Sequence, residues 1–339
     1  MEKLFFAFNE KLTALLDKGS LHCELSEKME ICIYFFIMGR KYSNKKHEDI
    51  AEKLLDNVVE QLNTLKNIEL LNGLSGIALG IHFLIDSNYI LGDPNEILEE
   101  IDNKIFNYLG YPERRKLSSL SNIHILYYLS FRFRAQQKGS ENEWLYKQLI
   151  IQQVDNTYAD SDTELWIEPN QYGLEFLLPQ FLFVLSKCLQ INVYNSRITK
   201  ILKEITPYVI CRIPQLHSNR MLLIWGMNSV LLQIQIPSWA AHRDLLIRET
   251  DLDIMINEFS KNDLFIVDGI SSLPILIEEL SLFFDRRNIT RIKQKITLSI
   301  EQSPLLEKIC NDEIAFNSSL GIKDGICGTF LIYNSLKNN

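Results

Sequence analysis

The 339-residue sequence is poor in the features that mark several classes of protein. Its six cysteines are scattered and never form a CxxC pair, which fits ordinary thiols in a reducing compartment rather than a disulfide scaffold. No basic cluster stands out, and the net charge of −8 disfavours nucleic-acid partners. Two short charge runs, 114–116 and 285–287, are interpreted as solvated turns or helix ends. Alternation of apolar and polar residues is also scarce, so the sequence predicts helices rather than strands.

The sequence also lacks an uninterrupted apolar run of membrane-spanning length. Its most apolar stretch, 174–189, contains Glu175, Pro179 and Lys187 and therefore predicts a buried helix. Residues 1–11 interleave apolar and charged side chains without a small-residue cleavage site, which predicts an amphipathic helix and not a signal peptide. We therefore expect a cytoplasmic protein with no membrane span.

What is present is a repeated motif. Gly73-Leu74-Ser75-Gly76 opens an apolar run, and the same shape returns as Gly325-Ile326-Cys327-Gly328. Weaker forms, in which a small or polar residue precedes an apolar run, occur at positions 25, 119, 173, 226 and 269. The seven markers are spaced by roughly fifty residues, enough for a marked apolar helix, a turn and a more polar helix. The sequence therefore predicts seven helical hairpins in series, with turns at 92–95 and 138–140.

A single hairpin of this kind cannot bury both faces of its apolar helix. Seven hairpins arranged in a ring can bury both faces, with the marked helices inside and the polar helices outside. Small residues let several helix N-termini approach one another, and Ser, Asp or Asn can cap them. We expect an all-α fold, an α/α toroid of about seven repeats that forms one domain over residues 1–339. An open solenoid is the alternative arrangement.

The chain resembles the lanthionine synthetase C-like family, the cyclases of lantibiotic-type peptide biosynthesis. The resemblance lies in residues 72–79 (NGLSGIAL) and 321–328 (GIKDGICG), and the seven-unit spacing supports it. It implies an α/α toroid whose active site lies where the N-termini of the inner helices converge.

The zinc chemistry of that family depends on residues that this chain lacks. Family enzymes hold Zn²⁺ with a Cys of the fifth unit and a Cys-His pair of the sixth, and a His of the fourth unit acts as acid and base. Aligned on the repeat glycines, this chain has Ile224, Val267, Asp268 and Tyr172 at those positions. Since Ile and Val offer zinc no donor atom, we expect no metal, no cofactor and no catalytic residue of the cyclase type.

Four other side chains could supply a relocated metal site, although such residues on apolar helices are usually packed in the core. They are His82, His124, Cys32 and Cys327. Cys327, near a helix start, could also have a lowered pKa and some nucleophilicity.

Polar and aromatic residues flank the repeat markers and are expected to line one mouth of the ring. The ligand-binding candidates are Tyr172, Glu175, Trp225, Asn228, Asp268 and Asp324. Aromatic walls with carboxylates suit a peptide or a sugar. Each has an ordinary interpretation too: the two aspartates as helix caps, and the two aromatic residues as packing inside the ring.

Three functional hypotheses follow. The first is a zinc-less, non-catalytic member of the family that binds a peptide substrate, or a peptide-modifying or export protein, during ribosomal-peptide maturation. The second is a hydrolase that cleaves a glycan with two carboxylates roughly 5–10 Å apart. Its candidate carboxylates are Glu24, Glu27, Glu168, Glu175, Asp268 and Asp324. The third is a zinc-dependent peptide cyclase with relocated ligands.

Overall fold

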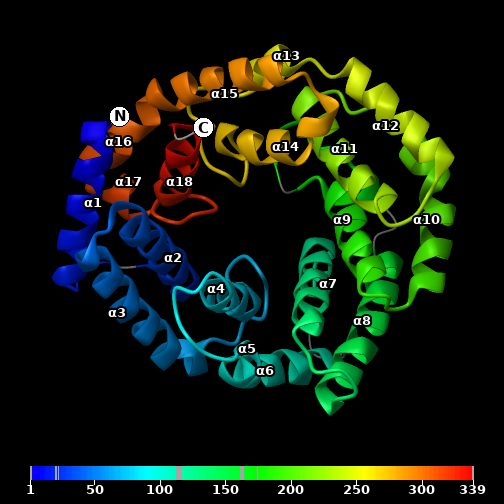
Figure 1. Cartoon of the computed structure of the whole chain (residues 1–339), viewed down its shortest axis with the longest axis horizontal. Coiled ribbons are helices and arrows are strands. Elements are labelled where there is room, and N and C mark those ends of the chain that lie inside the picture. The colour runs from blue at the N-terminus through cyan, green and yellow to red at the C-terminus, as the bar shows by residue number, and fades with distance from the viewer. Residues whose placement is uncertain are drawn as a thin grey trace. The chain divides into compact units, whose positions relative to one another are not determined.

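A computed structural model describes residues 2–19, 21, 23–111, 117–160, 164–173 and 175–337. All regular structure in these ranges is α-helix or short 3₁₀ helix, which confirms the predicted all-α class (Figure 1). Among the described helices, none has the length and apolarity needed to cross a membrane. The charge run at 114–116 and residue 174 lie outside the described residues.

The chain divides into two compact units, which are described separately. The first comprises Met1–Asn67, Gly80–Ile90 and Ile256–Asn339, and the second comprises Ile68–Leu79 and Leu91–Met255. Two helices, α4 (Leu74–Asp86) and α13 (Leu252–Asn257), are each divided between the units. The single closed ring stays a prediction.

The first unit combines helices from both ends of the chain. These are α1 (Glu2–Asp17), α2 (Leu25–Tyr42), α3 (Lys45–Gln61), η1 (Leu62–Thr64), η4 (Ile270–Ser272), α14 (Leu273–Glu279), η5 (Ser281–Phe283), α15 (Arg286–Glu301), α16 (Pro304–Asn311), α17 (Glu313–Asn317) and α18 (Ile326–Lys337). Helix α2 packs against α3 and α18, α18 packs against α15, and α1 packs against α16. The apolar α2 is buried on several sides. By contrast, α15 buries one stripe of isoleucines spaced three and four apart, as expected for an outer amphipathic helix.

The second unit contains three consecutive helical hairpins. Its elements are α5 (Pro94–Ile97), α6 (Glu99–Leu109), α7 (Ser119–Arg134), α8 (Glu141–Asp160), η3 (Glu164–Trp166), α9 (Leu177–Gln190), α10 (Asn195–Ile210), α11 (His217–Leu231) and α12 (Pro237–Glu249). Helix α9 packs against α7 and α11, so that these three helices form one layer. Helices α8, α10 and α12 pack against their hairpin partners and form a second layer beside the first (Figure 1). The predicted hairpins in series are therefore present within this unit. The turn at 138–140 is confirmed, with Gly139 at φ +79°.

The two strongest copies of the repeat motif build the same turn. A Cβ atom on Gly76 would lie 2.0 Å from the carbonyl oxygen of Leu70, and one on Gly328 would lie 1.8 Å from that of Ile322. In each case the carbonyl belongs to the residue six positions earlier. Both glycines are needed because the preceding loop folds back onto the first turn of the helix, where no side chain fits.

Most of the repeat markers precede or begin a helix. Five do so directly, at the starts of α2, α4, α7, η4 and α18. The marker at 173 lies four residues before α9, which begins at Leu177.

The marker at Gly226 was wrong as a helix start. Gly226 lies inside α11, and a Cβ atom there would come within 2.6 Å of the carbonyl oxygen of Pro179 on α9. This glycine therefore permits two neighbouring helices to cross closely. Ile224, aligned from it with a zinc-binding Cys, is fully buried in the same helix.

Candidate functional site

Carboxylates gather in the first unit around the loop that precedes α18. Glu30 of α2 accepts hydrogen bonds from the backbone N–H groups of Ile322 and Lys323. The Lys323 ammonium lies 3.3 Å from Glu30 Oε1 and 3.1 Å from Asp324 Oδ2. The Val267 N–H donates to the Lys323 carbonyl oxygen at 2.9 Å, which joins the segment before η4 to this loop. Helix α2 and the segments that precede η4 and α18 thus contribute to one polar cluster.

The environment of this cluster favours protonated carboxyl groups. Burial raises the pKa of Glu27, and the nearby Asp324 and Glu30 carboxylates raise it further, against a hydrogen bond from the Leu320 backbone. Burial also raises the pKa of Glu30, although the Lys323 charge opposes this. The pKa of Asp268, a residue exposed to solvent, is raised by partial desolvation of its carboxylate and by the neighbouring carboxylates of Asp263 and Asp324. Groups of this kind can serve as proton donors nearer neutral pH than ordinary carboxylates.

Cys327 lies beside these carboxylates but is not activated. Its side chain is completely buried. Burial raises the pKa of the Cys327 thiol, and the charges of Glu30 and Glu27 raise it further. The lowered pKa that its place near a helix start suggested is therefore not found, and the group stays a thiol.

A row of aromatic rings crosses three helices of the second unit. Trp225 of α11 stacks on Phe183 of α9 with ring centroids 4.3 Å apart and an interplanar angle of 23°. Phe183 lies 5.9 Å from Tyr127 of α7, which lies 6.3 Å from Phe131 one turn further along. All four rings are partly exposed. The Lys187 ammonium is 4.6 Å from the centre of the Phe183 ring, so the row combines apolar faces with a cation.

The six predicted binding residues fall into two groups, one in each unit. Asn228 follows Trp225 by one turn of α11, and its Oδ1 accepts from Arg243 Nη1 at 3.0 Å. Tyr172 is partly exposed and Glu175 is exposed, both in the segment that leads to α9. Asp268 and Asp324 are exposed residues of the first unit that influence each other electrostatically. The expectation that all six residues line one mouth of a closed ring stays a prediction.

Helix capping accounts for only some of the polar residues near the markers. Ser118 caps α7, because its hydroxyl oxygen accepts from the Ser121 N–H at 3.1 Å. The N-cap of η4 is Gly269, without a side-chain bond, so Asp268 does not cap that element.

Sequence reasoning missed Glu30, Lys323, Phe183 and Tyr127. Lys323 lies inside the quoted terminal motif, and Glu30 is a charged residue directly before the apolar run of α2. Either could have been recognised as a charge in an apolar setting. The aromatic pairing had no such signal, because it depends on how the helices cross.

Three of the four residues considered for a relocated metal site each contact a different neighbouring residue. His124 Nε2 lies 3.0 Å from Gln180 Oε1, His82 Nε2 lies 3.4 Å from Asp86 Oδ1, and the Cys32 thiol donates to the Ala51 carbonyl oxygen. Within the described residues, no three His, Cys, Asp or Glu side chains are grouped so that they could hold a metal ion.

No protein-family model matches this chain, and no curated protein does. Its function must therefore be inferred from its own motifs and geometry.

Proposed function

We propose that this chain is a peptide-binding accessory protein of ribosomal-peptide maturation, similar to the lanthionine synthetase C-like family but without zinc-dependent cyclase chemistry. In this proposal the hairpins close into a cytoplasmic α/α toroid of about seven repeats. The partner is a substrate peptide, or the protein that modifies or exports it.

The aromatic row from Trp225 to Phe131 is the observation that carries the proposal. Its rings are partly exposed and adjoin one another across three neighbouring helices. A contiguous group of exposed apolar rings is typical of a binding surface, unlike rings exposed singly. Stacked aromatic faces bind apolar and aromatic peptide side chains, while Asn228 nearby offers a polar group for the peptide backbone. The shared turn at Gly76 and Gly328 supports the internal repeat on which the toroid proposal rests.

The test is a titration with synthetic peptides that match short open reading frames beside the gene. We expect at least one peptide to bind with a Kd below about 1 mM. Trp225→Ala should weaken that binding at least about tenfold, since ring stacking is lost, whereas Trp225→Phe should retain most of it. Trp144→Ala is the matched control, because Trp144 is 62% exposed on α8 and is not one of the four rings of the row. Absence of binding, or an equal loss in the control, would refute the proposal.

Glycan hydrolysis is a second candidate, favoured by the carboxylates of the first unit. Glu30 and Asp324 both contact the Lys323 ammonium, so their oxygens lie within the roughly 10 Å limit for a glycosidase pair. The raised pKa values of Glu27 and Asp268 are a property of general acids. The proposal ranks second because the Lys323 charge opposes protonation of its neighbours.

The hydrolase candidate is tested by measuring reducing ends released from soluble polysaccharides. Hydrolysis that disappears in both Glu30→Gln and Asp324→Asn would support it. No release from any polysaccharide, or release unchanged in both variants, would remove it.

A further inference from the structure

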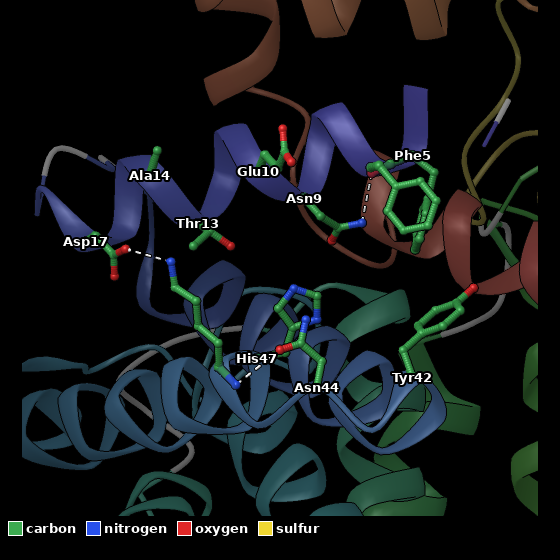
Figure 2. Close-up of a pocket in the computed structure, with 11 residues that line it drawn as sticks. Phe5, Asn9, Glu10, Thr13, Ala14, Asp17, Tyr42, Asn44 and His47 are labelled. Atoms are coloured by element: carbon green, nitrogen blue, oxygen red, sulfur yellow. Dashed lines mark hydrogen bonds and ion pairs between the residues drawn. The ribbon is translucent and has the colours of Figure 1, made fainter. Parts of the chain in front are cut away.

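A cavity of about 400 Å³ lies in the first unit between α1 and the junction of α2 with α3 (Figure 2). Its volume is in the range of small-molecule sites, about 300–1,000 Å³. Aromatic residues of α1 and α2 form one end, and an ion pair between Lys46 Nζ and Asp17 Oδ2, 3.3 Å apart, closes the other. Thr13 and His47 lie between, on opposite sides. The cavity thus has an apolar end and a polar end.

Three aromatic rings line one end of the cavity. Phe5 is buried, and its centroid lies 5.5 Å from Phe6 and 5.9 Å from Tyr42. Phe6 is 58% exposed and Tyr42 is 45% exposed. The Tyr42 hydroxyl donates to Asn334 Oδ1 at 2.9 Å, which fixes the direction of that ring. Such an arrangement can hold another aromatic ring and attracts a cation to the ring faces.

The charges around the cavity favour a cation. Lys46 is paired with Asp17, and burial together with the Lys46 charge lowers the pKa of His47, so its imidazole is neutral at neutral pH. Among the described lining residues, Glu10 alone carries a charge without an ion pair. One negative charge therefore remains for a ligand to complement.

The spacing of Glu10 and Phe6 sets the size of that ligand. They are four residues apart on α1, so their Cβ atoms are about 5–6 Å apart along one side of the helix. A short alkyl chain between an aromatic ring and an ammonium group spans a similar distance. In addition, His47 Nδ1 is buried without a hydrogen-bond partner, which leaves a polar atom in the wall.

We propose that this cavity binds a primary arylalkylamine, with the ammonium group at Glu10 and the ring against Phe6 and Tyr42. The amine is either a free molecule or the N-terminal aromatic residue of a peptide. This site is in a different unit from the aromatic row, and it is independent of the function proposed above.

The test compares three probes of nearly equal shape. Tyramine carries an ammonium group, 4-hydroxyphenethyl alcohol is neutral and 4-hydroxyphenylacetate is an anion. Calorimetry should give tyramine a Kd below about 1 mM, the alcohol a Kd at least about tenfold higher and the acid the weakest binding. The NMR signals of the His47 ring should shift with the same saturation curve.

Two variants and a control separate binding from folding. Glu10→Gln should remove the preference for tyramine over the alcohol, while Phe6→Ala should weaken both probes. Phe83→Ala, at a phenylalanine of α4 that is 40% exposed and does not line the cavity, should change neither. Circular dichroism of each variant checks that its helices are retained.

A second pair of probes identifies the source of the amine. Phe-Gly-Gly-amide with a free N-terminus should bind, and its acetylated form should not, if the site takes a peptide terminus. Binding of tyramine alone indicates a free amine, and either result supports the proposal. No binding of tyramine or the free peptide at ~10 mM, equal binding of the acid, or an unchanged preference in Glu10→Gln would overturn it.

Discussion

Arg132 and Asp102 form a buried ion pair inside the second unit, with Nη2 2.7 Å from Oδ2. The Arg132 side chain is completely buried, and the Tyr128 hydroxyl donates to the other carboxylate oxygen. Arg132 Nη2 also donates to the Pro94 carbonyl oxygen at 3.3 Å. The pair therefore links α7 to α5 and α6, in the part of the unit that supports Tyr127 and Phe131.

Removing the carboxylate of this pair should destabilise the protein strongly. Asp102→Asn leaves the Arg132 charge buried without a counterion, and we expect a loss of about 3–5 kcal/mol in unfolding free energy. Urea denaturation followed by circular dichroism measures it. Glu100→Gln breaks the more exposed pair with Lys104, 3.2 Å apart, and should cost at most about 1 kcal/mol. Equal effects in the two variants would show that burial of the pair contributes little.

The glycines of the repeat turn should not tolerate a methyl group. Gly76→Ala and Gly328→Ala each place a Cβ atom in steric overlap with a backbone carbonyl oxygen. We expect each variant to lose about 1–3 kcal/mol or more in unfolding free energy. Gly110→Ala is the control, because its nearest backbone contact would be 3.2 Å away. Thermal unfolding of the three variants provides the comparison. A change no larger at Gly76 than at Gly110 would contradict the proposed reason for the repeat glycines.

The carboxylates near α18 should lower stability at neutral pH. Burial raises the pKa of Glu27 in the folded protein. The Glu27 carboxyl group therefore keeps its proton to higher pH in the folded protein than in the unfolded chain. The stability contributed by the protonated group is therefore present in acid and is lost as the pH rises through the folded-state pKa. We expect Glu27→Gln to match the unmodified protein near pH 4 and to be more stable at pH 7.

Denaturant midpoints measured from about pH 4 to 7 test this expectation. Glu60→Gln, at an exposed site of α3, is the matched control. A destabilising effect of Glu27→Gln at pH 7 would mean that the ionised carboxylate is favourable in the folded state.

Protein purified without chelators should contain less than about a tenth of an equivalent of zinc by elemental mass spectrometry. The resemblance to the lanthionine synthetase C-like family would place a Cys-His pair where this chain has Val267 and Asp268, and Ile224 is buried within a helix. A full equivalent would return the cyclase hypothesis to first place. His82, His124, Cys32 and Cys327 would then be replaced one at a time.

Thiol labelling should distinguish the cysteines by burial. Cys211 is exposed, whereas Cys32, Cys188 and Cys327 are buried. We expect iodoacetamide to label Cys211 in the native protein and to label the three buried thiols only after denaturation, because thiolate formation and access are both suppressed by burial. Mass spectrometry of peptides locates the label, and Cys211→Ser is the control. Native labelling of Cys327 ahead of Cys211 would instead indicate an activated cysteine.

Local features of the fold could be read from the sequence. The glycines at 76 and 328 are required by a turn only a few residues long, so the motif itself carries the information. The alternation of apolar and amphipathic helices follows equally from spacing along the chain, as the isoleucine stripe of α15 illustrates.

Features that depend on contacts between distant helices could not be read in this way. Gly226 looked like another helix start, but it is required by the crossing of α9 and α11. The stacking of Trp225 on Phe183 arises from the same crossing. In the carboxylate cluster, repeat register pointed to Asp268 and Asp324, which influence each other electrostatically. The pairing of Asp324 with Lys323 could be seen only in the folded loop.

The hydrogen bonds that Glu30 accepts from the loop before α18 have a consequence for biosynthesis. They join residues 292 and 293 positions apart, and Lys11 similarly donates to the Cys310 carbonyl oxygen 299 positions away. The early helices of the first unit therefore cannot complete their packing until the last part of the chain has left the ribosome, ~15–60 s later at about 5–20 residues per second. The second unit, nearly continuous in sequence, is free to fold during that wait. The helices made first are thus expected to be among the last to reach their final packing, and their apolar surfaces are exposed to chaperones and proteases in the meantime.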